Sequence, residues 1–154
     1  MTSDPSSLTQ ARCSALEYLS RREHASLELR NKLARKGFEE NVIDCVLIQL
    51  RADKLLSDER FVESYVRSRT NKGYGPLRIQ QELQKRGISG EMLTDMLESN
   101  DAAWIKRARL VRQKRFGCSL PQSKGDFGKQ VRFLQYRGFT HSQIQAALSS
   151  DEDD

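Results

Sequence analysis

One short pattern of apolar and polar positions occurs three times along the chain. A leucine is followed by one or two cations, then by a glycine, and then by an apolar residue. The three copies are Leu33 to Phe38, Leu83 to Ile88 and Leu134 to Phe139. Cations favour the carboxyl end of a helix, and glycine readily adopts the left-handed conformation that ends one. The pattern therefore predicts that Gly37, Gly87 and Gly138 each terminate a helix.

Helical periodicity surrounds each copy. After Gly37, apolar residues recur at i, i+1, i+4 and i+5 through Val42, Ile43, Val46 and Leu47, which is the spacing of one helix face. Upstream helices are expected over residues 8–21, 57–71 and 101–116. No segment shows the sustained two-residue alternation of a strand. We therefore predict an all-α fold of three tandem three-helix repeats, with about nine helices.

The repeat boundaries follow from this spacing. We expect repeats at residues 1–55, 56–100 and 101–148, followed by an acidic flexible tail at 149–154. One three-helix unit of this size buries little apolar surface by itself. Stacking of the three units is therefore expected to give an elongated, curved body.

Particular side chains are expected to start or line these helices. Ser26 and Ser57 fit helix N-caps, Pro76 fits a first helical position, and Thr140 with Gln143 fits a capping box. The apolar faces expected in the third repeat are Trp104, Ala108 and Val111 on one helix, and Phe127, Val131 and Leu134 on another.

The composition is polar, with 37% hydrophobic and 31% charged residues. No stretch approaches the roughly 18 apolar residues of a membrane span, and the first residues lack the features of a secretory signal. Cys13, Cys45 and Cys118 form no C-x-x-C pair. We interpret Cys13 and Cys45 as small buried hydrophobic residues rather than as disulfide or metal ligands. A reducing cytoplasmic location without membrane contact is expected.

Basic charge is concentrated in two stretches of the chain. Residues 104–137 contain ten cations and one acid, residues 60–87 contain seven cations and two acids, and residues 39–59 contain two cations and six acids. A merely solvated helix usually interleaves the two signs. The near absence of acids from 104–137 favours a surface that faces a polyanion, either nucleic acid or an acidic protein.

The segment Lys72 to Pro76 is the most unusual loop. Its two glycines bracket Tyr74 before a helix start, where backbone N–H groups could bind a phosphate, although the pattern favours a tight turn. Arg78 falls in the first turn of the next helix, where the helix dipole disfavours a cation. We therefore expect an anionic binding partner for Arg78.

Catalytic chemistry finds little support. His24 and His141, the two histidines, flank helix starts and are expected to be surface or capping residues. No nucleophile motif surrounds a cysteine, and no phosphate-binding loop or metal-ligand spacing occurs. We predict no enzyme activity, no catalytic residue, no metal and no cofactor.

The second repeat carries the most specific motifs. These are Leu56-Ser57-Asp58-Glu59-Arg60-Phe61, Tyr65-Val66-Arg67-Ser68-Arg69, Lys72-Gly73-Tyr74-Gly75-Pro76, Arg78-Ile79, Glu82-Leu83 and Arg86-Gly87-Ile88. Together they closely resemble the RecX family of bacterial regulators of the RecA recombinase. The resemblance covers roughly residues 9–148. Ser57 stands where the family often has Asp, and Arg86 stands where it often has Lys.

The resemblance implies the same three-repeat fold and a non-enzymatic function. Such proteins bind RecA, lie in the groove of its DNA filament, and suppress ATP hydrolysis, strand exchange and coprotease activity, which links them to DNA repair, recombination and the SOS response. The implied partners of this monomer are RecA, its filament, and single- or double-stranded DNA. The residues expected to contact RecA or DNA are Arg67, Arg69, Lys72, Arg78, Lys85, Arg86, Arg107, Arg112 and Arg132. The alternative is a general DNA-binding helical module that acts without RecA, since three-helix units also occur in helix-turn-helix proteins.

Overall fold

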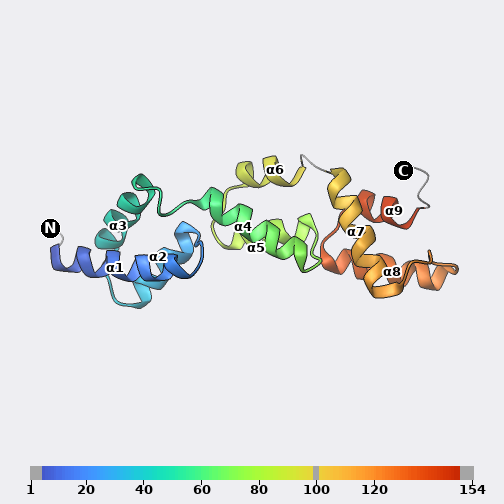
Figure 1. Cartoon of the computed structure of the whole chain (residues 1–154), viewed down its shortest axis with the longest axis horizontal. Coiled ribbons are helices and arrows are strands. Elements are labelled where there is room, and N and C mark those ends of the chain that lie inside the picture. Colours follow the sequence, from blue (N-terminus) through green and yellow to red (C-terminus); the bar gives the residue numbers. More distant parts are fainter. Residues whose placement is uncertain (1–4, 99–100, 150–154) are drawn as a thin grey trace. The chain divides into compact units, whose positions relative to one another are not determined.

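The computed structural model describes residues 5–98 and 101–149, and most of these residues are helical. The helices are α1 (Pro5–Arg21), α2 (Ser26–Arg35), α3 (Glu40–Ala52), α4 (Asp58–Asn71), α5 (Pro76–Lys85), α6 (Gly90–Glu98), α7 (Asp101–Phe116), α8 (Lys124–Arg137) and α9 (His141–Leu148), as Figure 1 shows. Within the described part of the chain there are nine helices and no strand. The predicted all-α architecture is confirmed. Residues 150–154 of the expected acidic tail lie outside the described residues.

Contacts between residues divide the chain into two compact units. The first unit extends to Tyr65 and includes Lys85–Ile88, and the second comprises Val66–Gln84 together with the chain from Ser89 onward. The division falls within α4, so the middle repeat contributes residues to both units.

The core of the first unit lies where α1 packs against α2 and α3. Ala11 and Ala15 are fully buried on α1, where small side chains allow a neighbouring helix to come close. Leu29 and Leu33 cover the core from α2. The predicted face of α3 is confirmed by the burial of Val42, Ile43, Val46, Leu47 and Leu50.

The core of the second unit lies where α7 packs against α8 and α9. Trp104 and Ala108 are buried as predicted, but the next buried position along the stripe is Arg112, at i+4 from Ala108, and Val111 is only half-buried. On α8 the expected face is wrong at its start, because Phe127 is 38% exposed. The buried residues there are Gln130 and Leu134, one turn apart.

The predicted helix ends are largely confirmed. Gly37, Gly87 and Gly138 have φ values of +94°, +83° and +99°, which is the left-handed conformation expected after a helix. Pro76 begins α5, and the capping box of Thr140 and Gln143 begins α9. At α4, the Ser57 hydroxyl accepts a hydrogen bond from the Arg60 amide at 3.2 Å.

Ser26 does not cap α2, which corrects the sequence-based expectation. Ser26 is the first residue of α2, and its amide donates to the Asp58 carboxylate at 2.7 Å. Its hydroxyl accepts instead from Arg51 Nε at 3.3 Å. The cap is therefore supplied by the acidic first turn of α4, a contact between residues 32 positions apart in the sequence.

Two further expectations about single residues are wrong. Cys13 and Cys45 are exposed, because Ala11 and Ala15 hold the buried side of α1 and the apolar stripe of α3 points away from Cys45. His24 is only 1% exposed and lies in the turn before α2, with its ring 5.9 Å from that of Tyr18. His141 is exposed at the start of α9, as expected. Across residues 5–98 and 101–149, no helix combines the length and apolar character needed to cross a membrane.

Candidate nucleic-acid interface

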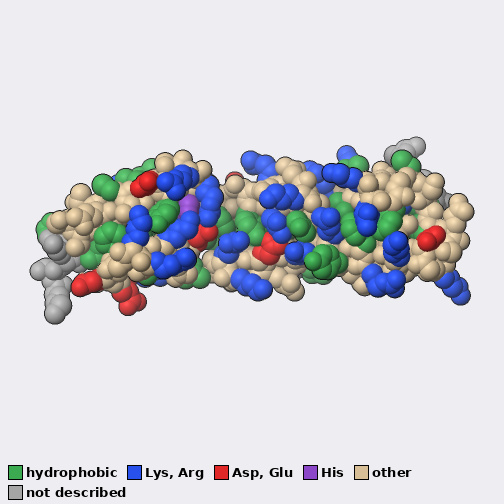
Figure 2. All heavy atoms as spheres, turned by 90° about the horizontal axis from the view of Figure 1, so that it is seen from below, with side chains coloured by type: hydrophobic (Ala, Val, Ile, Leu, Met, Phe, Trp, Pro, Cys, Tyr) green, Lys and Arg blue, Asp and Glu red, His purple; other side chains and the backbone are tan. Residues whose placement is uncertain are grey.

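A groove of about 350 Å³ lies within the second unit. Its walls are the last turn of α4, the Lys72-Gly73 turn, and the adjacent sides of α7 and α8. The cations that line it are Lys72, Arg107, Lys114, Arg115 and Arg137, and none of its described lining residues is acidic. On the face of the molecule drawn in Figure 2, Lys and Arg side chains outnumber acidic ones and lie among apolar side chains.

Helix α7 presents cations and apolar residues together to this groove. Arg107, Leu110, Val111 and Lys114 follow helical spacing and line one side of the helix. Leu110 is 50% exposed. Cations spaced along one helix face repel each other, and α7 is held in place by Trp104 and Ala108, which are buried in the core. An anion in the groove would offset that repulsion.

Arg137 is the best-positioned cation of the groove. Its Nη1 donates to the Lys72 carbonyl at 3.0 Å, just beyond the end of α4. Its guanidinium lies 5.2 Å from the ring centre of Phe133 and 5.1 Å from that of Tyr74. A cation at the end of α4 is favoured by the helix dipole, so this arginine is held by the fold while it lines the groove.

Three arginines surround the ring of Tyr74. Besides Arg137, the guanidinium carbons of Arg69 and Arg78 lie 3.9 Å and 4.4 Å from the ring centre. Glu82 pairs with both, at 2.6 Å from Arg69 and 3.4 Å from Arg78. These two predicted binding residues therefore have internal partners in the structure.

Arg78 has internal partners in the structure, and its expected contact with an external anion stays a prediction. Arg78 Nη1 also donates to the Tyr136 carbonyl at 3.3 Å, and its guanidinium lies 5.2 Å from the Tyr136 ring centre. A carboxylate, a carbonyl and two rings thus explain a cation in the first turn of α5.

The Lys72–Pro76 loop does not form a phosphate cradle from its backbone. The Gly73 and Tyr74 amides donate back to the end of α4, at Thr70 and Arg69. The Gly75 amide donates to the Arg137 carbonyl at 2.7 Å. These N–H groups are used inside the protein, which confirms the tight-turn interpretation.

The other predicted binding residues fall into different surroundings. Arg67, Lys72, Arg107 and Arg132 are exposed in the second unit, although only Lys72 and Arg107 line the groove. Lys85 and Arg86 belong to the first unit, where Arg86 lies 3.9 Å from Glu28 and 5.0 Å from the Tyr65 ring centre. The structure therefore brings together only part of the predicted set.

Arg112 was predicted to contact RecA or DNA, and the structure corrects this expectation. It is 2% exposed, and its Nη1 donates to the Ser119 carbonyl at 3.1 Å and to Gln130 Oε1 at 3.3 Å. These bonds join α7 to the following loop and to α8. Its position eight residues after the buried Trp104 is the sequence signal that separates it from Arg107.

Of the described residues that line the groove, only Lys72 and Arg107 belong to the predicted binding set, and four of the missing ones carry charge or an aromatic ring. They are Lys114, Arg115, Phe133 and Arg137. Lys114 lies seven residues after Arg107, the spacing of two helix turns, and this periodicity could have selected it. Phe133 and Arg137 on α8 come close to α7 only through tertiary packing, which no local sequence pattern indicates.

The arrangement defines a class of protein: an all-helical, repeat-built chain with a cation-lined groove and, among its described residues, no cluster of three or more potential metal-ligand side chains. Family models described as the first, second and third three-helix domains of RecX match residues 11–50, 57–97 and 105–148. The chain therefore belongs to the RecX family of regulatory proteins, as the sequence resemblance indicated.

Individual relatives agree with this assignment. Regulatory protein RecX of Halorhodospira halophila is 44% identical over 144 residues, covering 93% of this chain and 89% of the relative. That of Legionella pneumophila is 39% identical over 137 residues, covering 89% of this chain and 91% of the relative. The crystal structure of RecX from Lactobacillus salivarius shares the fold, with a TM-score of 0.80 at 24% identity over 92% of this chain and 94% of the other.

Proposed function

We propose that this protein is a non-enzymatic regulator that binds the RecA recombinase and its DNA filament. Bound there, it inhibits ATP hydrolysis, strand exchange and coprotease activity, and so modulates DNA repair and recombination. Membership of a family of regulatory proteins supports the regulatory role. The RecA-specific part of the proposal rests on what the family resemblance implies.

The single observation that supports a particular binding surface for this function is the cation-lined groove of the second unit. Lys and Arg side chains that neutralise phosphates release condensed counterions, which drives binding to nucleic acid. Arg107, Lys114 and Arg115 would supply such contacts, and the buried Thr70 hydroxyl in the same groove has no hydrogen-bond partner among the described residues. Leu110 and Phe133 add apolar surface suited to sugar or base.

The cations outside the groove extend the proposed contact surface. Arg67 and Arg132 are exposed on α4 and α8 of the second unit and are available to RecA or DNA. We place the protein in the cytoplasm, where a reducing environment suits its three unpaired cysteines.

A general DNA-binding module that acts without RecA is the second candidate, and the same groove favours it. The two candidates differ in their dependence on RecA. Binding to RecA in the absence of DNA, measured by light scattering or fluorescence anisotropy, supports the regulator. Binding to DNA alone, with no response to RecA, supports the module.

The test of the proposed function is RecA ATPase activity on single-stranded DNA, titrated with this protein. We expect inhibition at substoichiometric or near-equal amounts of protein to RecA, with no hydrolysis by the protein alone. Unchanged ATPase activity at excess protein contradicts the proposal. The variant Lys124→Gln/Lys129→Gln, which removes two exposed cations that do not line the groove, should inhibit as well as the wild type.

A further inference from the structure

A second cation-lined pocket, of about 210 Å³, lies within the first unit. One wall is α2, which contributes Lys32 and Arg35, and the other is Lys85, the last residue of α5, together with Arg86 directly after it. Among the described residues that line this pocket, Glu28 is the only acid. Four cations thus face one carboxylate, and none of these residues belongs to the groove of the second unit.

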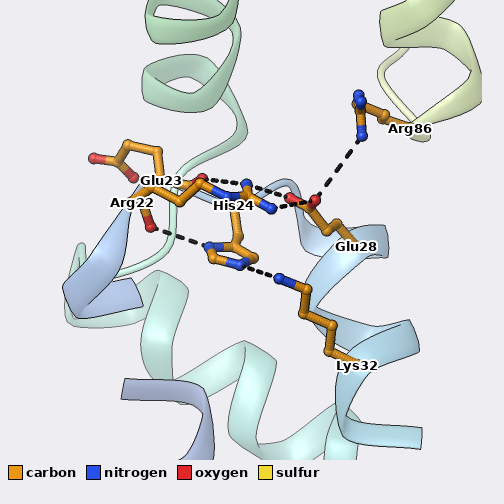
Figure 3. A network of polar contacts seen from close by, with 6 residues as sticks. All are labelled: Arg22, Glu23, His24, Glu28, Lys32 and Arg86. Carbon is orange, nitrogen blue, oxygen red and sulfur yellow. Dashed lines mark hydrogen bonds and ion pairs between the residues drawn. The ribbon is translucent and has the colours of Figure 1, made fainter. Parts of the chain in front are cut away.

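Glu28 forms an ion pair with Arg22, and Arg22 does not line the pocket. The two arginine Nη atoms reach the two carboxylate oxygens at 2.9 Å and 2.7 Å (Figure 3). Burial opposes ionisation of Glu28, but the hydrogen bonds and charge of Arg22 outweigh it and lower the pKa of Glu28. Arg86 lies farther away, at 3.9 Å. The pocket cations are therefore poorly neutralised from within the protein.

Lys32 connects the pocket to a buried histidine. Its Nζ lies 2.9 Å from His24 Nε2, and His24 Nδ1 lies 3.0 Å from the Arg22 carbonyl oxygen (Figure 3). This pattern assigns a neutral imidazole that donates from Nδ1 to the carbonyl and accepts at Nε2 from the ammonium. Burial, followed by the positive charge of Arg22, lowers the pKa of Lys32. The ammonium thus lies in a region of excess positive charge.

The wall formed by Lys85 and Arg86 is held close to α2 by packing. A Cβ atom at Gly87 would lie 2.8 Å from Leu27 Cδ2, so the chain approaches α2 closely at this glycine. Arg86 Nε is buried and has no hydrogen-bond acceptor within the described part of the chain. A pre-formed pocket therefore contains cations in excess and an unused buried donor.

We propose that this pocket is a binding site for a phosphate group. Arginine presents a fork of donors that matches phosphate oxygens, and lysine adds a point charge. The pocket has one lysine and one arginine on α2 and another lysine and arginine at or directly after the end of α5. The phosphate comes from one of two sources that share this chemistry: free inorganic phosphate or a phosphodiester of a nucleic-acid backbone.

His24 gives a direct measurement of occupancy. A bound phosphate beside Lys32 offsets the positive charges that disfavour a protonated imidazole, so the pKa of His24 should rise when the pocket fills. The ring resonances of the two histidines can be followed by NMR during titration with sodium phosphate and, at matched ionic strength, with sodium chloride. His141 is exposed on the second unit and serves as the internal reference.

A pair of variants matched in charge tests the location. Arg35→Gln/Lys85→Gln removes two exposed pocket cations, and should weaken phosphate binding about tenfold if each contributes about 0.7 kcal/mol. Lys124→Gln/Lys129→Gln makes the same change in net charge outside both sites and should bind phosphate like the wild type.

The outcomes separate the two sources and can overturn the site. A rise in the pKa of His24 with sodium phosphate, absent from the pocket variant, identifies free phosphate as a ligand. A rise seen only with a short oligothymidylate, and absent from the same variant, identifies the backbone phosphate. No response to either probe, or equal weakening in both variants, overturns the proposal. Because the groove residues are unchanged in both variants, this result is separate from the fate of the proposed RecA function.

Discussion

The amide of Gly75 donates a hydrogen bond to the carbonyl oxygen of Arg137 at 2.7 Å. The Leu77 amide donates to the next carbonyl, that of Gly138, at 2.9 Å. These two bonds join the start of α5 to the turn between α8 and α9. Arg137 lines the groove, so the first bond fixes the backbone of one groove cation, and the Arg137 side chain in turn donates to the carbonyl of Lys72.

Gly75 should not tolerate a side chain. A Cβ atom there would lie 2.6 Å from the carbonyl carbon and oxygen of Gly138, and both are backbone atoms that cannot rotate away. We expect Gly75→Ala to lower the free energy of unfolding by about 1–3 kcal/mol, the range of overpacking, as measured by urea denaturation. Gly90→Ala is the control, because nothing lies within 4 Å of its Cβ position. Equal denaturation midpoints for the two variants contradict the close contact.

Arg107 and Arg112 should respond in opposite ways to the same substitution. Arg107→Gln removes an exposed groove cation, so it should weaken DNA binding and leave the denaturation midpoint unchanged. Arg112→Gln removes buried bonds to Ser119 and Gln130, so it should cost about 1–3 kcal/mol of stability. Binding assays on each variant, made where both remain folded, separate the roles. A stable Arg112→Gln variant that no longer binds DNA contradicts the buried assignment.

Glu82 should offset the positive charge of the two arginines with which it pairs beside Tyr74. Glu82→Gln leaves Arg69 and Arg78 without their shared carboxylate, so it should cost about 1–2 kcal/mol of stability, because the pair is partly exposed to solvent. Loss of this negative charge should also strengthen binding to single-stranded DNA. Anisotropy titration gives the affinity and urea denaturation gives the stability. Weaker DNA binding by a folded Glu82→Gln variant contradicts this electrostatic effect of Glu82.

The fold was predictable because its signals are local. The three glycines mark helix ends through their own backbone conformation. The buried face of α3 follows from apolar residues that recur at helical spacing within one short segment. The errors occur where distant residues decide. Ser26 does not act as a cap because Asp58, 32 residues away, supplies the acceptor. His24 is buried by Tyr18 and Lys32, and no pattern around His24 itself indicates this.

The site was predictable only in part for the same reason. Net charge over 104–137 pointed to the right helices, and Lys72 and Arg107 do line one groove. Charge counting could not distinguish Arg107 from the buried Arg112, because both are arginines on α7. Charge counting also could not show that Arg78 forms an ion pair with Glu82, lies over the Tyr74 ring and donates to the Tyr136 carbonyl.

The stability of the first unit should fall as the pH drops below about 6.5. Burial, with the charges of Arg22 and Lys32, lowers the pKa of His24 below its ordinary value of 6.5, although the bond to the Arg22 carbonyl and the charge of Glu28 oppose this. The unfolded chain therefore binds a proton at His24 before the folded chain does. The contribution of the neutral His24 to stability is therefore complete above the pKa of His24 in the unfolded chain. It is lost as the pH falls towards the lower pKa of His24 in the folded chain.

Urea denaturation between pH 5 and pH 8 checks this dependence, over a range that spans the ordinary histidine pKa of about 6.5. His24→Gln should remove the change in denaturation midpoint near pH 6, and His141→Gln should retain it, because His141 is exposed. The carboxylate of Glu28, whose pKa is also lowered, loses its stabilising charge only at more acidic pH, below its ordinary 4.5. An identical pH profile for both histidine variants contradicts the buried neutral imidazole.

The groove cations of the second unit are central to the proposed function, and the salt dependence of filament binding tests them most directly. The measurement compares wild type, Arg107→Gln/Lys114→Gln and the control Lys124→Gln/Lys129→Gln on RecA filaments formed on single-stranded DNA. We predict weaker binding by the groove variant, with the slope of log K against log salt reduced by up to about 0.7 for each phosphate that is no longer neutralised. The control should keep the wild-type slope. Equal affinities and slopes for the groove and control variants, both folded, would contradict the central claim.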